Sequence, residues 1–180
     1  HKDTISFEDV ILSGLAPDKG LYLPNSLTID NLNHLTEEDL SYEDFVKTIF
    51  ISLDKASAKY VDDLEIYPGF ENSPEPILKE LNASTVVMEL FHGPTKSFKD
   101  YALQPLGAIA NRRLDELGER GLVIVATSGD TGSAAIQAVK SSENIDIVVL
   151  HPSDKISEYQ RKQMTSVIQD NVLNIAVEGS

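Results

Sequence analysis

The stretch LVIVATSGDTGSAAIQAV, residues 122–139, decides the fold class of this chain. It opens with an apolar run that is typical of a buried strand in a parallel sheet. A turn containing Gly129 and Gly132 follows, and the small residues after it favour a helix. The stretch therefore predicts a strand, a turn and a helix, with residues 127–132 at the carboxyl end of the strand. Open α/β sheets bind their ligands at that edge.

The same alternation of strands and helices continues on both sides of this stretch. Apolar runs predict the strands, and longer stretches with helical periodicity predict the helices. Such alternation is typical of an α/β fold, in which a parallel sheet carries helices on its faces. The predicted strands are 85–90, 122–126, 145–150 and 172–177, and the predicted helices are 97–117, 131–140 and 155–167.

The N-terminal part of the chain has a different pattern, which is mainly helical. Apolar residues from Phe7 to Leu15 recur at roughly helical spacing, and residues 40–60 favour one amphipathic helix. Residues 67–76 are rich in proline and read as a connecting segment. We therefore predict a mainly helical N-terminal subdomain, 1–75, followed by the first part of an α/β domain, 76–180.

The composition excludes several classes of function. The 180 residues carry a net charge of −14, and residues 1–90 alone contribute −12, so a nucleic-acid partner is not expected. No apolar run is long enough for a membrane span. The chain has no cysteine, which removes disulfides and thiolate metal ligands, and no metal site is predicted. Since the N-terminus is also polar, we expect a cytoplasmic protein.

The turn at residues 127–132 has the chemistry of an anion site. Free backbone N–H groups and the positive end of the helix dipole suit a carboxylate or a phosphate at the start of a helix. Ser128 and Thr131 add hydroxyl donors, and the glycines allow a close approach of the backbone. An ordinary strand-to-helix loop capped by Asp130 fits the residues about equally well. The pattern is neither GxGxxG nor GxxxxGK[ST], so nucleotide binding is not favoured.

A second motif, ELFHGPTKSFKDYALQ, occupies residues 89–104. Ser97 and Asp100 have the spacing of a capping box, which predicts that Lys99 lies in the first turn of a helix. The positive potential there disfavours a second charge and so favours the free amine that attacks an aldehyde. A simply solvated lysine is the commoner outcome at such a position. Pro105, well inside the predicted helix, predicts a kink or a restart near Gln104.

The residues FHGPTKSFKDYALQ (91–104) and ATSGDTGSAA (126–135) together closely resemble threonine synthases of the bacterial and fungal type. These belong to the larger group of pyridoxal-phosphate enzymes related to tryptophan synthase β. The likeness extends to GLAPDKGLYLP (14–24), HPSDKISEYQRKQMT (151–165) and NVLNIAVEG (171–179). The resemblance therefore spans nearly the whole chain, and it implies the fold of the tryptophan-synthase-β-like enzymes.

The resemblance also implies an activity: conversion of O-phospho-L-homoserine, a small-molecule substrate, and water to L-threonine and phosphate. Lys99 corresponds to the lysine that bonds to pyridoxal 5'-phosphate, and Asp130 falls near the phenolic oxygen of that cofactor. The turn at residues 127–131 corresponds to the loop that holds the carboxylate of the substrate. The implied carboxylate-binding residues are Thr127, Ser128, Gly129 and Thr131, and the candidates for the substrate phosphate are His92, Thr95, Lys96 and Ser97.

Two alternatives to a threonine synthase follow from the same residues. A phospho-lyase or amino-acid dehydratase shares the lysine and the carboxylate loop but eliminates to a keto acid. A noncatalytic module is the alternative from another class, because the family's phosphate loop for the cofactor and the group that faces the pyridine nitrogen lie later than Ser180. For the same reason we expect residues 1–180 alone to be inactive.

Overall fold

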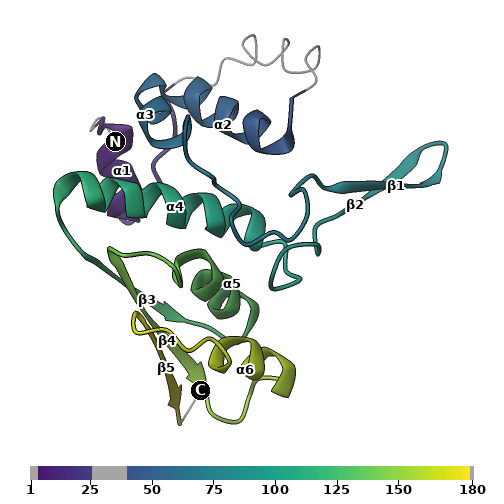
Figure 1. Cartoon of the computed structure of the whole chain (residues 1–180), viewed down its shortest axis with the longest axis vertical. Helices are drawn as coiled ribbons and strands as arrows, with labels where there is room; N and C mark the ends of the chain where they lie inside the picture. The colour runs from purple at the N-terminus through teal and green to yellow at the C-terminus, as the bar shows by residue number, and fades with distance from the viewer. Residues whose placement is uncertain (1–3, 26–39, 179–180) are drawn as a thin grey trace. The chain divides into compact units, whose positions relative to one another are not determined.

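A computed structural model describes residues 4–25 and 40–178 of the chain (Figure 1). The chain forms two compact units, residues 1–66 and residues 67–180. No helix in the described ranges is long and apolar enough to cross a membrane.

The first unit is helical, as its sequence predicts. Helix α1, Phe7–Ser13, starts at Ser6, and helix α2, Tyr42–Leu53, starts at Ser41. Each serine hydroxyl accepts a hydrogen bond from the backbone N–H of an aspartate three residues later, which satisfies a donor at the helix start.

The single helix predicted over residues 40–60 is wrong, because the helix ends at Leu53. Asp54 takes up an extended backbone, with φ of −153°, and its carboxylate accepts a hydrogen bond from Ala56 N. That bond starts a new, short helical segment, in which the 3₁₀ helix η2, Lys55–Ser57, leads into helix α3, Ala58–Val61. Aspartate favours such caps over helix interiors, which is why it divides the predicted helix.

The second unit opens with an antiparallel hairpin of β1, Ile77–Asn82, and β2, Thr85–Glu89. The predicted strand at 85–90 is confirmed, whereas β1 was not predicted. After the hairpin, helices and parallel strands alternate. They are α4 (Asp100–Leu117), β3 (Gly121–Ala126), α5 (Asp130–Val139), β4 (Ile145–Pro152), α6 (Glu158–Thr165) and β5 (Val172–Val177).

The parallel sheet is confirmed, with strand order β3-β4-β5 and β4 at its centre. Helices α5 and α6 lie on the same side of it (Figure 1). The side chains of β4 that face these helices are buried, and those that point the other way are only partly covered. The core of the unit consists of Leu114, Ala135, Ile136, Val139, Ile145, Ile147, Val149 and Met164.

Strand β3 is more exposed than its apolar sequence predicts. Leu122 and Ile124 keep 60% and 64% of their surface accessible. Ile124 pairs with Val148, and paired residues of neighbouring strands point to the same side of a sheet. Val148 lies outside the buried set of β4, so this is the side away from the core. The prediction that β3 is buried is therefore wrong for the described part of the chain.

Helix α4 runs through Pro105 as one element, so the predicted restart near Gln104 does not occur. Proline removes the N–H that would bond to the carbonyl four residues earlier, which here belongs to Tyr101. The hydroxyl of Tyr67 donates to that carbonyl instead. The neighbouring segment is also held, because Gly69 N donates to Oε1 of Gln104.

Candidate active site

The residues between β2 and α4, residues 92–99, form what we call the lysine turn. The turn is anchored by the next residue, Asp100, which is fully buried at the start of α4. The carboxylate of Asp100 accepts two hydrogen bonds from Thr95, one from the backbone N at 2.9 Å and one from Oγ1 at 2.8 Å. Burial raises the pKa of the Asp100 carboxyl, and the bonds from Thr95 oppose that rise. Asp100 therefore ties the middle of the turn to the helix.

The predicted capping box between Ser97 and Asp100 is wrong. Ser97 Oγ accepts its hydrogen bond from Lys99 N at 3.3 Å, and the carboxylate of Asp100 is directed to Thr95. Lys99 itself is the residue that precedes the first helical residue, whereas the sequence predicted it inside the first helical turn. The competing partner, Thr95, lies outside the local spacing on which the capping-box prediction rests.

Lys99 places a partly exposed amine at the entrance of α4. Its Nζ lies 4.7 Å from the centre of the Phe98 ring. Within the described ranges, no carboxylate forms an ion pair with Lys99. An amine without a carboxylate partner is available for covalent attachment to an aldehyde.

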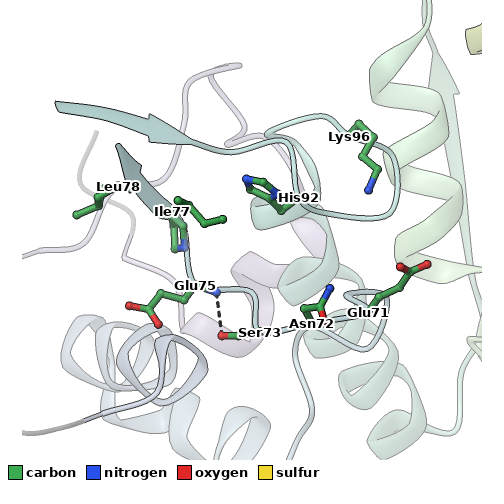
Figure 2. Close-up of a pocket in the computed structure, with 9 residues that line it drawn as sticks. Glu71, Asn72, Ser73, Glu75, Ile77, Leu78, His92 and Lys96 are labelled. Carbon is green, nitrogen blue, oxygen red and sulfur yellow. Dashed lines mark hydrogen bonds between the residues drawn. The ribbon is translucent and has the colours of Figure 1, made fainter. Parts of the chain in front are cut away.

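The lysine turn also borders a pocket of about 660 Å³ that lies beside the hairpin (Figure 2). Lys96, with a left-handed backbone at φ of 61°, and His92 lie on one side of it. Glu71 lies across the pocket from them (Figure 2). His92 Nε2 is 3.0 Å from Oε2 of Glu89, so this histidine is held by a hydrogen bond. Lys99 is not among the residues that line the pocket.

The second part of the site is the glycine turn, residues 127–132, between β3 and α5. Gly129 precedes the first helical residue, and no side chain caps the helix there. The carboxylate of Asp130 instead accepts a hydrogen bond from Nε2 of Gln160 at 2.7 Å. The alternative in which Asp130 acts as a simple cap is therefore wrong, because the side chain that accepts from the first turn of α5 is Thr127, through Gly132 N.

Within the glycine turn, the hydroxyls differ in what they contact. Thr127 Oγ1 accepts hydrogen bonds from Gly129 N at 3.0 Å and from Gly132 N at 3.3 Å, so it shapes the turn. Ser128 is exposed and Thr131 is partly exposed, which leaves both side chains accessible to a ligand. The backbone N–H groups at the start of α5 add the donor chemistry of an anion site.

Helix α6 forms hydrogen bonds with both the lysine turn and the glycine turn. Gln160 bonds to Asp130 of the glycine turn, and Gln163 donates from Nε2 to the carbonyl of Thr95 in the lysine turn at 2.9 Å. Sequence reasoning did not single out either glutamine. Their spacing of three residues on a predicted helix was the available signal, because it puts both side chains on one face.

The site has the groups for a carbonyl cofactor and an anionic substrate. The amine of Lys99 fits an aldehyde, and the start of α5 fits a carboxylate. The described ranges contain no group of three or more histidine, cysteine, aspartate or glutamate side chains that could hold a metal ion.

Comparison with known proteins gives one consistent family. The family model described as "Threonine synthase N terminus" matches residues 1–60. Threonine synthase from Pseudomonas aeruginosa is 42% identical over 98% of this chain, and threonine synthase-like 2 from Xenopus laevis is 36% identical over 98%. The chain spans 39% of the length of each of these two relatives.

A solved structure supports the same family. The structure of pyridoxal-phosphate-bound threonine synthase from Brucella melitensis superposes with a TM-score of 0.85 at 35% identity. The superposition covers 98% of this chain and 39% of that structure. The similarity therefore extends across the elements that carry both the lysine turn and the glycine turn.

Proposed function

We propose that the protein is a threonine synthase, which converts O-phospho-L-homoserine and water to L-threonine and phosphate, because the family model of the threonine synthase N terminus and the threonine synthases compared above match it. Pyridoxal 5'-phosphate is the proposed cofactor, as in the Brucella relative. The observation that carries the proposal is the position of Lys99. Its amine has no carboxylate partner among the described residues, and helix α6 connects the lysine turn to the glycine turn.

Lys99 has two roles in this proposal. It holds the cofactor covalently, and after substrate displaces it, its amine accepts a proton from the substrate and returns one. When bound, the cofactor supplies an electron sink for the removal of those protons. The buried pair of Asp100 and Thr95 keeps the lysine turn in place while the amine changes partner.

The glycine turn is proposed to bind the carboxylate of the substrate. The hydroxyls of Ser128 and Thr131 and the N–H groups at the start of α5 are the donors, and Thr127 supports the turn from within. Gly129 is proposed to let the ligand approach the backbone, and Asp130 would contact the cofactor when it is bound. The bond from Gln160 orients the Asp130 carboxylate.

Lys96 and His92 are proposed to contact the phosphate of the substrate. Both line the same pocket, and Lys96 supplies a positive charge there. The buried hydroxyl of Ser97 bonds to Lys99 N, so its proposed role is to support the lysine turn near that phosphate. Glu71 across the pocket opposes an anion, which makes the charge of Lys96 more important for binding.

Reductive trapping of the cofactor tests the proposal. In the full-length protein, borohydride reduction followed by peptide mapping is expected to find the pyridoxyl group on Lys99. Lys99→Ala should abolish the label, whereas the matched control Lys96→Ala should retain it. A label at another lysine in the unmutated protein would contradict the assignment.

A phospho-lyase or amino-acid dehydratase remains the second candidate. It shares the lysine and the glycine turn with the synthase, and the relative from Xenopus laevis is named threonine synthase-like rather than threonine synthase. The two activities differ in their products, because the alternatives release a keto acid. Product analysis with O-phospho-L-homoserine separates them: threonine supports the synthase, and a keto acid with no threonine supports the alternative.

Residues 1–180 alone are proposed to be inactive. The chain spans 39% of its Pseudomonas aeruginosa relative, and Leu122 and Ile124 of the sheet are largely exposed, so water has access to one side of the fold. Water weakens the electrostatic contacts that orient substrate. The test is to assay purified residues 1–180 with cofactor and substrate, and turnover near that of the full-length protein would contradict the proposal.

A cytoplasmic location is also proposed. The absence of cysteine among the 180 residues supports a reducing compartment, where disulfides are not needed. Fractionation of the source cells tests the proposed location. Detection of the full-length protein in membrane, periplasmic or organellar fractions would contradict it.

A further inference from the structure

Helix α6 contacts both turns of the candidate site through two glutamines. Gln163 Nε2 donates to the carbonyl of Thr95, and Gln160 Nε2 donates to Oδ1 of Asp130. Residues three apart on a helix have Cβ atoms about 5 to 6 Å apart on one face. One rigid element therefore sets the separation between the two turns.

The amide of Gln160 is fixed in orientation. Its Oε1 accepts a hydrogen bond from Ser157 Oγ at 3.1 Å, which leaves Nε2 to face Asp130. Ser157 also caps the helix, because its Oγ accepts from Gln160 N. The hydrogen bonds that cap α6 and those that connect it to the glycine turn therefore form one network.

The glycine turn has room for α6 only because of its two glycines. A Cβ at Gly129 would overlap Nε2 of Gln160, and the φ of this residue is 155°. A Cβ at Gly132 would lie 2.7 Å from the sulfur of Met164, which is fully buried. Both glycines are therefore matched to side chains of α6.

Thr95 anchors the lysine turn through hydrogen bonds on both sides of the residue. The N–H and hydroxyl of Thr95 bond to Asp100, and its carbonyl accepts from Gln163. Lys96, the next residue, has a left-handed backbone, so the chain direction changes directly after this anchor. Loss of the Gln163 bond would free the side of the turn that faces α6.

The two faces of α6 make different contacts. Its outer face carries exposed charges, with Lys162 paired to Glu158. Met164 enters the core, and its carbonyl accepts a hydrogen bond from Nδ2 of Asn174 in β5. Met164 and Asn174 hold the helix to the sheet, and the two glutamines connect it to the turns.

We propose that Gln160 and Gln163 are positioning residues that set Lys99 in register with the glycine turn. The inference rests on the proposed function, in which the cofactor on Lys99 and the substrate carboxylate on the glycine turn must meet. A displacement of about 1 Å between reacting groups costs about 100-fold in rate, so two hydrogen bonds on one helix face are enough to matter.

The two glutamines are expected to affect different kinetic constants. Gln163 holds the turn next to Lys99, so Gln163→Leu in the full-length holoenzyme should lower kcat about tenfold with little change in KM. Gln160 holds the glycine turn, so Gln160→Leu should raise KM about tenfold with a smaller change in kcat. Lys162→Ala, on the outer face of the same helix, is the matched control and should change neither constant.

A readout that is independent of turnover accompanies the kinetics. The circular dichroism of the bound cofactor reports how it is held, and Gln163→Leu should change this signal while the far-ultraviolet spectrum and Tm stay close to those of the unmutated protein. If Gln163→Leu does not fold, Gln163→Glu, which keeps the shape but turns the donor into an acceptor, replaces it. The same change in the cofactor signal is expected.

The outcomes separate this inference from the proposed function. Equal and parallel losses in both variants, with KM unchanged and an unaltered cofactor signal, would overturn the positioning roles, because they indicate only a smaller folded fraction. Folded variants that match Lys162→Ala would also overturn them. If the unmutated protein makes no threonine, the proposed function fails, and the cofactor signal of Gln163→Leu still decides the role of Gln163.

Discussion

Tyr67 donates its hydroxyl proton to the backbone carbonyl of Tyr101 over 3.0 Å. This carbonyl is the acceptor that Pro105 leaves without its usual helical donor, because it lies four residues before the proline. Tyr67 is buried, so water is a poor substitute for its hydroxyl. A side chain from the segment before the hairpin thus completes the hydrogen bonding of α4 and keeps the helix continuous through its proline.

Tyr67 and Pro105 should therefore be energetically coupled. Tyr67→Phe is expected to lower the free energy of unfolding by about 1 to 2 kcal/mol, because a buried carbonyl loses a donor. In a Pro105→Ala background the same change should cost less, by at least about 0.5 kcal/mol, because the new N–H bonds to Tyr101. Urea unfolding of the four full-length variants measures the coupling.

The matched control is Tyr22→Phe, which removes the same hydroxyl from the other unit of the chain. It should show no coupling to Pro105. Identical costs of Tyr67→Phe with and without the proline would contradict the proposed replacement of one donor by another.

Asp100 should make stability depend on pH. Burial raises its pKa above the ordinary value of 3.8, so the folded state binds the proton more tightly than the unfolded state does. Stability is then highest below the ordinary pKa and falls as the pH rises through the interval up to the raised one. Asp100→Asn removes this dependence but weakens the bonds to Thr95, at a cost of about 1 to 3 kcal/mol at low pH.

The difference in unfolding free energy between Asp100→Asn and the unmutated protein should shrink as the pH rises above the ordinary pKa of 3.8. Urea unfolding across this range measures it. Asp115→Asn, which removes an exposed carboxylate from the same helix, is the matched control. A gap that widens with pH would mean that the hydrogen bonds from Thr95 outweigh burial.

The sequence predicted the elements better than the contacts between them. Apolar periodicity is local, and it correctly indicated the parallel strands β3, β4 and β5 with their helices. The break at Asp54 was missed, because one residue can either continue a helix or cap a new one with almost the same neighbours. The exposure of β3 depends on its place at the edge of the sheet, which apolar content alone does not indicate.

The site shows the same division between local pattern and distant partner. The lysine and the glycine turn were recognised from short motifs. The hydrogen bonds of Asp100 and Gln163 to Thr95 were not recognised. The bond from Gln163 joins residues that are 68 apart in the chain, and short motifs do not indicate such a distant partner. Gly129 and Gly132 were interpreted as space for a ligand, and the structure adds that they make space for α6.

Substitution of the two glycines should reveal this packing. Gly132→Ala is expected to destabilise the full-length protein by about 1 to 3 kcal/mol, because the new Cβ would lie 2.6 Å from Cγ2 of Thr127 and 2.7 Å from the sulfur of Met164. In a Thr127→Ser background, which keeps the hydroxyl but removes Cγ2, the cost should be smaller. Thermal unfolding of the single and double variants measures the difference.

Gly129→Ala is the contrasting case, because it adds backbone strain to the overlap with Gln160. Its φ of 155° is rarely adopted by residues with a side chain, so Gln160→Ala should relieve only part of the cost. Full recovery in that double variant would mean that strain contributes nothing and that the packing against α6 alone requires this glycine.

The hydroxyls of the glycine turn should discriminate between substrate and cofactor. Ser128 and Thr131 are accessible, whereas Thr127 is used within the turn, so Ser128→Ala and Thr131→Ala remove donors from a ligand and not from the fold. A hydrogen bond to a charged group is worth about 1.5 to 3 kcal/mol, so each change should weaken the use of substrate about 10- to 150-fold. Cofactor affinity should stay nearly unchanged, because this turn is proposed to bind the carboxylate of the substrate.

The measurements are kcat/KM with O-phospho-L-homoserine and equilibrium titration of the apoenzyme with pyridoxal 5'-phosphate. Ser133→Ala is the control, because the Ser133 hydroxyl is buried and bonds to the carbonyl of Asp130. It should lower stability and leave the affinity for substrate intact. Loss of cofactor with normal substrate affinity in the Ser128 and Thr131 variants would reverse the assignment and give the glycine turn to the cofactor phosphate.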